Sequence, residues 1–174
     1  ARFQLVLAAN PCPCGMVATP GADCRCGSQV VRRYAHRLSG PILDRIDIQH
    51  TLPPLRQSLL AVPTSAPEGS AVVAGRVLAA RDRAAVRLAS LGHRMNAAVP
   101  GPVLRRDLPL PADTRMLDDA VRRGLLSARG VDKVLRLAWT LCDLTGQSRP
   151  GADHVRAALA MRQGEESAAV MAHG

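Results

Sequence analysis

Apolar and polar positions divide the chain into a short first part and a longer second part. The first part opens with an apolar run at residues 3–9, which is interrupted only by Gln4 and stops at Asn10. A run of this length predicts a buried strand with Asn10 at its carboxyl end, the edge at which open α/β sheets bind ligands. Apolar alternation at residues 46–51 predicts a further strand. Residues 1–52 are therefore expected to be an α/β unit.

Two segments in the first half of the chain connect or follow these strands. Residues 29–38 favour a helix that begins after Ser28, because their apolar positions share one side. Residues 53–70 hold four prolines, three serines and one glycine. Such a composition is typical of a linker. We therefore expect a domain boundary at residues 53–70.

After residue 70 the apolar positions recur at spacings of three and four, which is typical of amphipathic helices. The first such stripe comprises Val73, Val77, Ala80, Ala84, Leu88 and Leu91. The strongest stripe begins after Ser127 and ends at Gly146, which are good residues to start and stop a helix. It comprises Val131, Val134, Leu135, Ala138, Leu141 and Cys142.

Two further helices complete the second part of the chain. Asp113 is expected to cap a short one, with Leu117, Ala120 and Val121 facing inward. Pro150 precedes the last one, which would bury Val155, Ala158, Leu159 and Met161. Residues 71–164 are thus predicted to be an all-α domain, and residues 165–174 a disordered tail.

Composition and charge refine this picture only locally. The 174 residues are 47% hydrophobic but 2% aromatic, and the formal net charge is +9. No run of about eighteen apolar residues and no signal-peptide pattern is present, so a cytoplasmic protein is expected. The basic excess is concentrated at residues 76–106, which carry seven arginines against Asp82 alone. Four of these positions form a line beside the apolar stripe, namely Arg76, Arg83, Arg87 and Arg94. They could be a solvated helix face or a surface for phosphate backbones.

Four cysteines follow the first predicted strand in the pattern C-x-C-x9-C-x-C, at Cys12, Cys14, Cys24 and Cys26. Four thiolates this close in sequence can surround one tetrahedral Zn²⁺, which would be structural because no coordination position stays open. The alternatives are a metal-free loop and redox chemistry. Disulfides are disfavoured in a reducing cytosol.

Three polar residues have ordinary explanations when the residues alone are considered. Asn10 can cap the turn into Pro11. Arg45 lies between Asp44 and Asp47, where a surface ion pair stabilises by less than about 1 kcal/mol. Arg129 is harder to explain, because a positive charge in the first turn of a helix opposes the helix dipole. A residue placed against its local preference suggests a further purpose.

The segments AANPCPCG, CRC, RYAHRLSGPILDRIDI and LSARGVDKVLRLAWTLCDL together resemble the magnesium-chelatase-like AAA+ ATPases, in their competence-linked branch. The resemblance implies that residues 1–52 are the C-terminal part of an AAA+ core, with the last strands of its parallel sheet and a Cys-rich loop, and that residues 71–164 are a helical lid. It also implies a role for each of the three polar residues. Asn10 would be the sensor 1 residue that orients the attacking water, and Arg45 the arginine finger that reaches ATP on a neighbouring subunit. Arg129 would be the sensor 2 arginine that touches the nucleotide phosphates.

The same resemblance implies cofactors and partners. These are ATP with Mg²⁺, a homo-oligomer that forms a hexameric ring, and DNA, which the motor would remodel by branch migration in recombination. The chain contains no phosphate-binding glycine loop with its lysine and no Walker B acidic pair. We therefore expect a C-terminal piece of the motor that is inactive alone, with ATP and Mg²⁺ bound mainly by a preceding part. The alternative is a zinc-stapled DNA-binding module without catalysis of its own.

Overall fold

The computed structural model describes residues 3–19, 21–52 and 67–164. These residues fall into two compact units. One unit contains residues up to 46 together with residue 52, and the other contains residues 47–51 and the chain from 67 onward. Most of the predicted linker, at residues 53–66, and the predicted tail, at residues 165–174, lie outside the described residues.

The first unit contains two helices, α1 (Ser28–Ala35) and α2 (Gly40–Leu43). Helix α1 begins directly after Gly27, so Gly27 takes the cap position and the predicted cap residue Ser28 is the first helical residue. Helix α2 has Pro41 in its first turn, where the missing N–H costs no helical hydrogen bond. The segment that precedes α1 is a loop that carries four of the cysteines.

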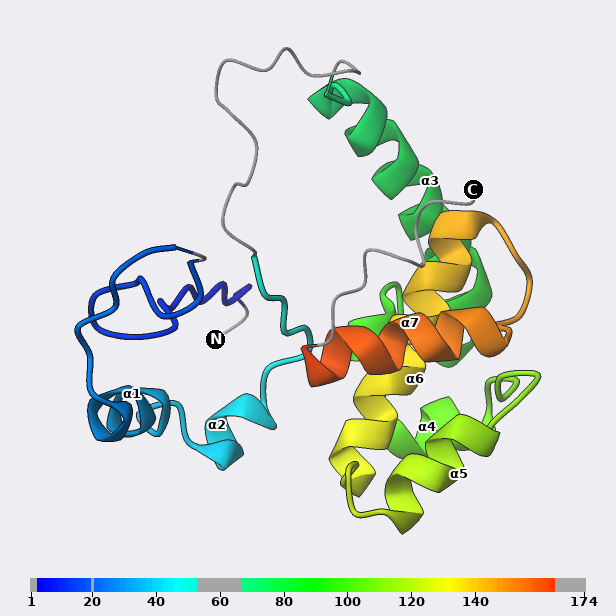
Figure 1. The fold of residues 1–174 in the computed structure, drawn as a ribbon. Coiled ribbons are helices and arrows are strands. Elements are labelled where there is room, and N and C mark those ends of the chain that lie inside the picture. The colour runs from blue at the N-terminus through cyan, green and yellow to red at the C-terminus, as the bar shows by residue number, and fades with distance from the viewer. Residues whose placement is uncertain (1–2, 20, 53–66, 165–174) are drawn as a thin grey trace. The chain divides into compact units, whose positions relative to one another are not determined.

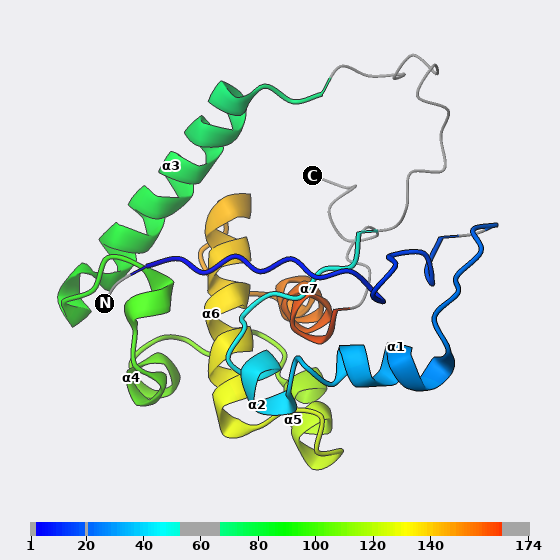
Figure 2. The ribbon, with the colours of Figure 1, turned by 90° about the vertical axis from the view of Figure 1, so that its left-hand side faces the viewer.

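The predicted parallel sheet is wrong, since residues 3–19, 21–52 and 67–164 form helices and loops but no strand. At residues 3–9 the apolar side chains are exposed, with Phe3 at 76% and Val6 at 82% of their full accessibility. Figure 2 shows this segment as a plain coil. An apolar run becomes a strand only where a neighbouring strand supplies hydrogen-bond partners. Within residues 46–51, the Gln49 N–H donates to the carbonyl of Met161, which belongs to a helix and not to a strand.

The prediction of an all-α second part is confirmed. It comprises α3 (Ser70–Leu88), the short 3-10 helices η1 (Ala89–Leu91) and η2 (Asn96–Ala98), α4 (Gly101–Arg106), α5 (Arg115–Arg122), α6 (Ala128–Thr145) and α7 (Ala152–Gln163). Helix α6 contacts α3, α4, α5 and α7. In Figure 1, α7 crosses α6 while the first half of α3 extends beyond the other helices. In the part of the chain that the structure describes, no helix is both long and apolar enough to span a membrane.

Helix α6 is the centre of this unit and forms as its sequence pattern predicts. The Ser127 hydroxyl accepts the Gly130 N–H at 3.1 Å, and Gly146 ends the helix at φ 73°, a conformation that favours glycine. The predicted stripe is buried or packed against the core, and Trp139 is buried with it. The pattern therefore predicted both ends and the inner face of α6.

The neighbouring helices follow their predicted stripes only in part. On α3 the stripe is buried from Ala80 to Leu88, whereas Val73 remains 36% exposed. On α5, Leu117 and Ala120 are buried but Val121 is 46% exposed, contrary to prediction. The difference has a simple cause, because a stripe is buried only over the length at which another helix faces it.

Candidate functional site

The structure brings the four N-terminal cysteine thiols together. Their sulfur atoms all lie within 4.8 Å of one another. The Sγ of Cys12 is 3.4 Å from that of Cys14 and 3.9 Å from that of Cys24, and 3.7 Å separates Cys14 from Cys24. Zn–S bonds of about 2.3 Å at tetrahedral angles place sulfur atoms about 3.8 Å apart. The cluster therefore has dimensions that fit one tetrahedral metal ion.

A tight turn brings the first two thiols onto one side of the loop. The Gly15 N–H donates to the Cys12 carbonyl at 3.0 Å. Gly15 has φ 80°, in the left-handed region that other residues adopt at a cost. Cys12 is fully buried, and no other described residue between 3 and 52 is buried. Such a loop lacks a core of its own, so a bound metal would supply the missing stabilisation.

The thiols influence one another's protonation. Burial raises the pKa of Cys12, but hydrogen bonds from the Val17 backbone and from Cys14 and Cys24 lower it to about 6. A backbone hydrogen bond at Cys26 lowers the pKa of Cys24, yet burial and the neighbouring thiols raise it to about 11. One thiolate thus forms easily and opposes the ionisation of the next. A cation at the centre is what would keep all four ionised.

The other predicted site residues lie on the surface. Asn10 is exposed and sits next to the cysteine loop, with its side-chain amide facing Gly15. Arg45 is exposed after α2 and donates to the Pro41 carbonyl at 2.8 Å. Arg129 is exposed in the first turn of α6. These positions leave the sensor and finger roles as predictions.

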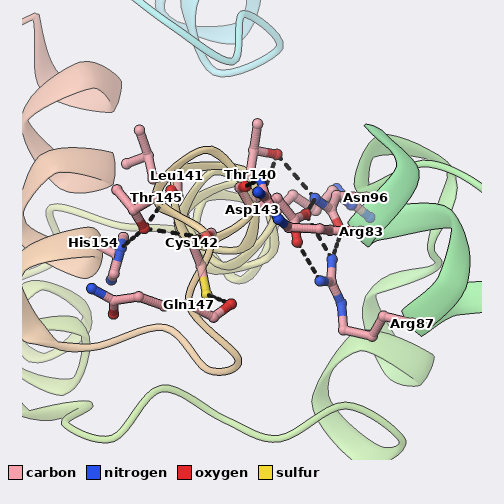
Figure 3. A network of polar contacts seen from close by, with 11 residues as sticks. Arg83, Arg87, Asn96, Thr140, Leu141, Cys142, Asp143, Thr145, Gln147 and His154 are labelled. Atoms are coloured by element: carbon pink, nitrogen blue, oxygen red, sulfur yellow. Dashed lines mark hydrogen bonds and ion pairs between the residues drawn. The ribbon is translucent and has the colours of Figure 1, made fainter. Parts of the chain in front are cut away.

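Two arginines of α3, Arg83 and Arg87, bond to Asp143 of α6. Arg87 donates to the Asp143 carboxylate through its two terminal guanidinium nitrogens, Nη1 and Nη2, and Arg83 donates to the Asp143 carbonyl at 2.7 Å. The Arg87 guanidinium also lies over the Trp139 ring, 4.1 Å from its centre. Both arginines therefore join α3 to α6 (Figure 3). Arg76, in contrast, pairs with Glu68 near the start of α3.

Asn96 completes this polar network. Its side-chain oxygen accepts from Arg87 at 2.8 Å, and its nitrogen donates to Asp143 at 2.9 Å and to Thr140 at 3.2 Å. The sequence interpretation missed Asn96 and Asp143. A signal was available for Asp143, because a carboxylate next to the apolar stripe of a helix requires a buried partner.

A second buried polar group joins α6 to α7. The Gly151 N–H donates to His154 Nδ1 at 3.0 Å, so the ring proton is on Nε2, which donates to the Thr145 hydroxyl at 2.9 Å. Figure 3 shows His154 directed toward Thr145. Burial lowers the pKa of His154, which agrees with a neutral ring. The ring therefore acts as a structural connector in its uncharged form.

Comparison with known proteins places both parts of the chain in one family. The family model described as magnesium chelatase, subunit ChlI matches residues 1–60. The model described as magnesium chelatase, subunit ChlI C-terminal matches residues 67–162. Together the two models cover the cysteine loop, Arg45 and nearly all of the helical unit.

Individual relatives agree with these matches. An uncharacterized protein of Mycobacterium tuberculosis is 50% identical over 164 residues, which are 94% of this chain and 32% of the relative. Competence protein ComM of Haemophilus influenzae is 35% identical over 93% of this chain and 31% of its own length. Protein YifB of Escherichia coli is 34% identical over the same shares. The chain thus spans about a third of the length of these relatives. With a family model covering more than half of its residues, the chain belongs to the magnesium chelatase ChlI family.

Proposed function

We propose that this chain is the part of an ATP-driven, magnesium-chelatase-like motor that completes the nucleotide site and couples it to DNA remodelling. The observation that supports the proposal is the family match over both parts of the chain, with Asn10, Arg45 and Arg129 inside the matched residues. Asn10 would position the attacking water, and Arg45 and Arg129 would contact the nucleotide phosphates. Each side chain suits its task, because an amide can donate and accept while neutral and an arginine stays charged.

The exposed position of Arg45 is compatible with action on a neighbouring subunit. The Arg45 guanidinium lies on the surface of its unit and donates to the Pro41 carbonyl at 2.8 Å. Its planar fork can bond two phosphate oxygens as charge develops in the transition state. A finger that acts between subunits requires a neighbouring copy of the chain, so we propose a homo-oligomer, most simply a hexameric ring.

The four cysteines would hold a structural Zn²⁺ in this motor. Zinc would supply stability to the loop and no chemistry, because Cys12, Cys14, Cys24 and Cys26 would occupy all four coordination positions. Asn10 lies two residues before Cys12 in sequence. A metal that fixes the loop would therefore also fix the backbone that carries Asn10.

DNA is the proposed substrate of the motor. The relative from Haemophilus influenzae is named a competence protein, and the resemblance of the sequence motifs implies branch migration of DNA. The local basic excess at residues 76–106 favours a polyanionic partner. Arg83 and Arg87 contribute less to such a surface than the sequence suggests, because both bond to Asp143. Arg81 and Arg94 are exposed on the same segment and are better candidates for phosphate contacts.

The decisive experiment is the substitution Arg45→Ala in the motor assembled from the whole protein. ATP hydrolysis should fall at least about a thousandfold, as for other arginine fingers, while ATP binding stays close to wild type. Arg33→Ala is the matched control, because Arg33 is an exposed arginine of α1 in the same unit. Loss of binding together with hydrolysis would assign Arg45 a structural role instead.

The alternative function, a zinc-stapled DNA-binding module without catalysis, is supported by the cysteine cluster alone. It predicts DNA binding that is indifferent to ATP and to Arg45→Ala. The motor predicts DNA-stimulated hydrolysis that Arg45→Ala abolishes. Measuring DNA affinity and ATP turnover with the same variants separates the two functions.

A further inference from the structure

Residues 47–51 lie in the helical unit, although the residues up to 46 and residue 52 lie in the other unit. The segment forms no helix or strand. We call residues 47–51 the strap. Two groups of contacts attach it to the helical unit, and neither was apparent from the sequence.

The first attachment is an ion pair with α6. Lys133 Nζ lies 3.0 Å from Asp47 Oδ1, and the Lys133 side chain is 8% exposed whereas that of Asp47 is 66% exposed. An ammonium group that is largely withdrawn from water depends on a nearby carboxylate to offset the loss of hydration. Lys133 is also the single lysine among the 23 basic residues of the chain. This pair therefore holds the beginning of the strap against α6.

The second attachment is at the end of α7. The Gln49 N–H donates to the Met161 carbonyl at 2.8 Å, and Gln49 Nε2 donates to the Arg162 carbonyl at 3.2 Å. The last carbonyls of a helix have no donors within the helix, so they need partners from elsewhere. Gln49 supplies two such donors. Gln49 thus caps the end of α7, although it is far from this helix in sequence, and the same bonds fix the middle of the strap.

We infer that the strap positions Arg45, and that Lys133 and Gln49 are positioning residues for it. Arg45 precedes Asp47 by two residues, a chain length of at most about 7 Å. Holding Asp47 against α6 restricts how far the backbone of Arg45 can move. The inference rests on the proposed role of Arg45 as an arginine finger.

Helix α6 would then be connected to two nucleotide contacts. Arg129 precedes Lys133 by four residues on α6, so the two side chains lie on the same face of the helix. Arg129 is carried by α6 directly, and Arg45 is connected to it through Asp47 and Lys133. A movement of α6 that repositions Arg129 would pull on the strap. The arrangement gives the helical unit a way to adjust the finger of its own subunit.

Amide hydrogen exchange on the purified chain tests the attachment itself. The Gln49 amide should be protected in the wild type and should exchange at least about tenfold faster in Lys133→Met, while amides in the middle of α6 keep their protection. Asp47→Asn provides a second variant at an exposed site, in case Lys133→Met does not fold. Arg156→Met is the control, because Arg156 pairs with Asp153 on the surface of α7. The attachment of the strap would be refuted if the Gln49 amide were unprotected in the wild type, or if its exchange rate were unchanged in both variants.

ATP turnover in the assembled motor tests the positioning role. Lys133→Met should lower kcat about tenfold with ATP affinity unchanged, and Lys133→Arg should restore most of the rate because it keeps the charge. If Arg45→Ala abolishes turnover while Lys133→Met and Asp47→Asn leave it unchanged, the positioning role is wrong and the proposed function stands. If Arg45→Ala leaves turnover unchanged, the proposed function fails and the positioning role fails with it. The exchange measurement judges the attachment in either case.

Discussion

Arg87 of α3 and Asp143 of α6 form a two-point ion pair between these helices, with Arg87 Nη2 2.8 Å from Asp143 Oδ2. The Asp143 side chain is 2% exposed and that of Arg87 18%. Asn96 bonds to both side chains, and the Trp139 ring lies under the guanidinium. The pair therefore belongs to a network that joins η2, α3 and α6.

Removing one partner of this pair should destabilise the helical unit strongly. We expect Asp143→Ala to lower the free energy of unfolding by about 3 kcal/mol or more, because the buried Arg87 charge loses its carboxylate. Asp119→Ala is the control, since Asp119 pairs with Arg122 on the surface of α5 and should cost less than about 1 kcal/mol. Urea unfolding followed by circular dichroism measures both. Equal losses for the two variants would show that the network contributes nothing beyond a surface pair.

Zinc content of the purified chain tests the cysteine cluster. We expect about one equivalent per chain, tetrahedral thiolate bands after cobalt substitution, and loss of the metal in the Cys12→Ser, Cys24→Ser double variant. Cys142→Ser is the control and should keep the metal, because Cys142 is buried in α6 and donates to the Gln147 carbonyl. Acidification should release the metal as the thiolates take up protons. A folded, reduced sample without metal would refute the zinc site.

Stability of the helical unit should depend on pH through His154. Burial lowers the pKa of His154 in the folded state, so the unfolded state binds the proton more readily. The contribution of the neutral ring is fully present above the unfolded value of about 6.5 and is lost as the pH falls toward the folded value. His154→Gln should flatten this acid-side slope, whereas His36→Gln, at an exposed position after α1, should not. Unfolding midpoints between pH 5 and pH 8 give the slopes, and identical slopes for wild type and His154→Gln would contradict the assignment.

The purified chain by itself should show no ATP hydrolysis. Its sequence contains no glycine loop with a lysine to hold the phosphates and no Walker B acidic pair. A phosphate-release assay at high protein concentration, with and without DNA, measures this directly. Turnover that follows the chain through purification and disappears in Arg129→Ala would refute the prediction and would place a complete site within these residues.

Local patterns predicted the helical unit well and the first unit poorly. The ends and inner face of α6 follow from Ser127, Gly146 and the spacing of apolar residues, which are local properties. The strand at residues 3–9 failed because a strand depends on hydrogen bonds from another segment, and none of the described residues provides them. The same apolar residues are exposed as a result.

The sequence by itself determined the cysteine spacing and predicted roles for Asn10, Arg45 and Arg129, because these motifs are carried by short segments. The tertiary structure decided which polar groups are structural. It pairs Arg87 with Asp143 across 56 residues of chain and attaches Asp47 to Lys133. Such pairs depend on how helices pack, and packing brings together residues that no local spacing relates. Buried charges must find partners wherever the fold places them, so these contacts could be recognised only in three dimensions.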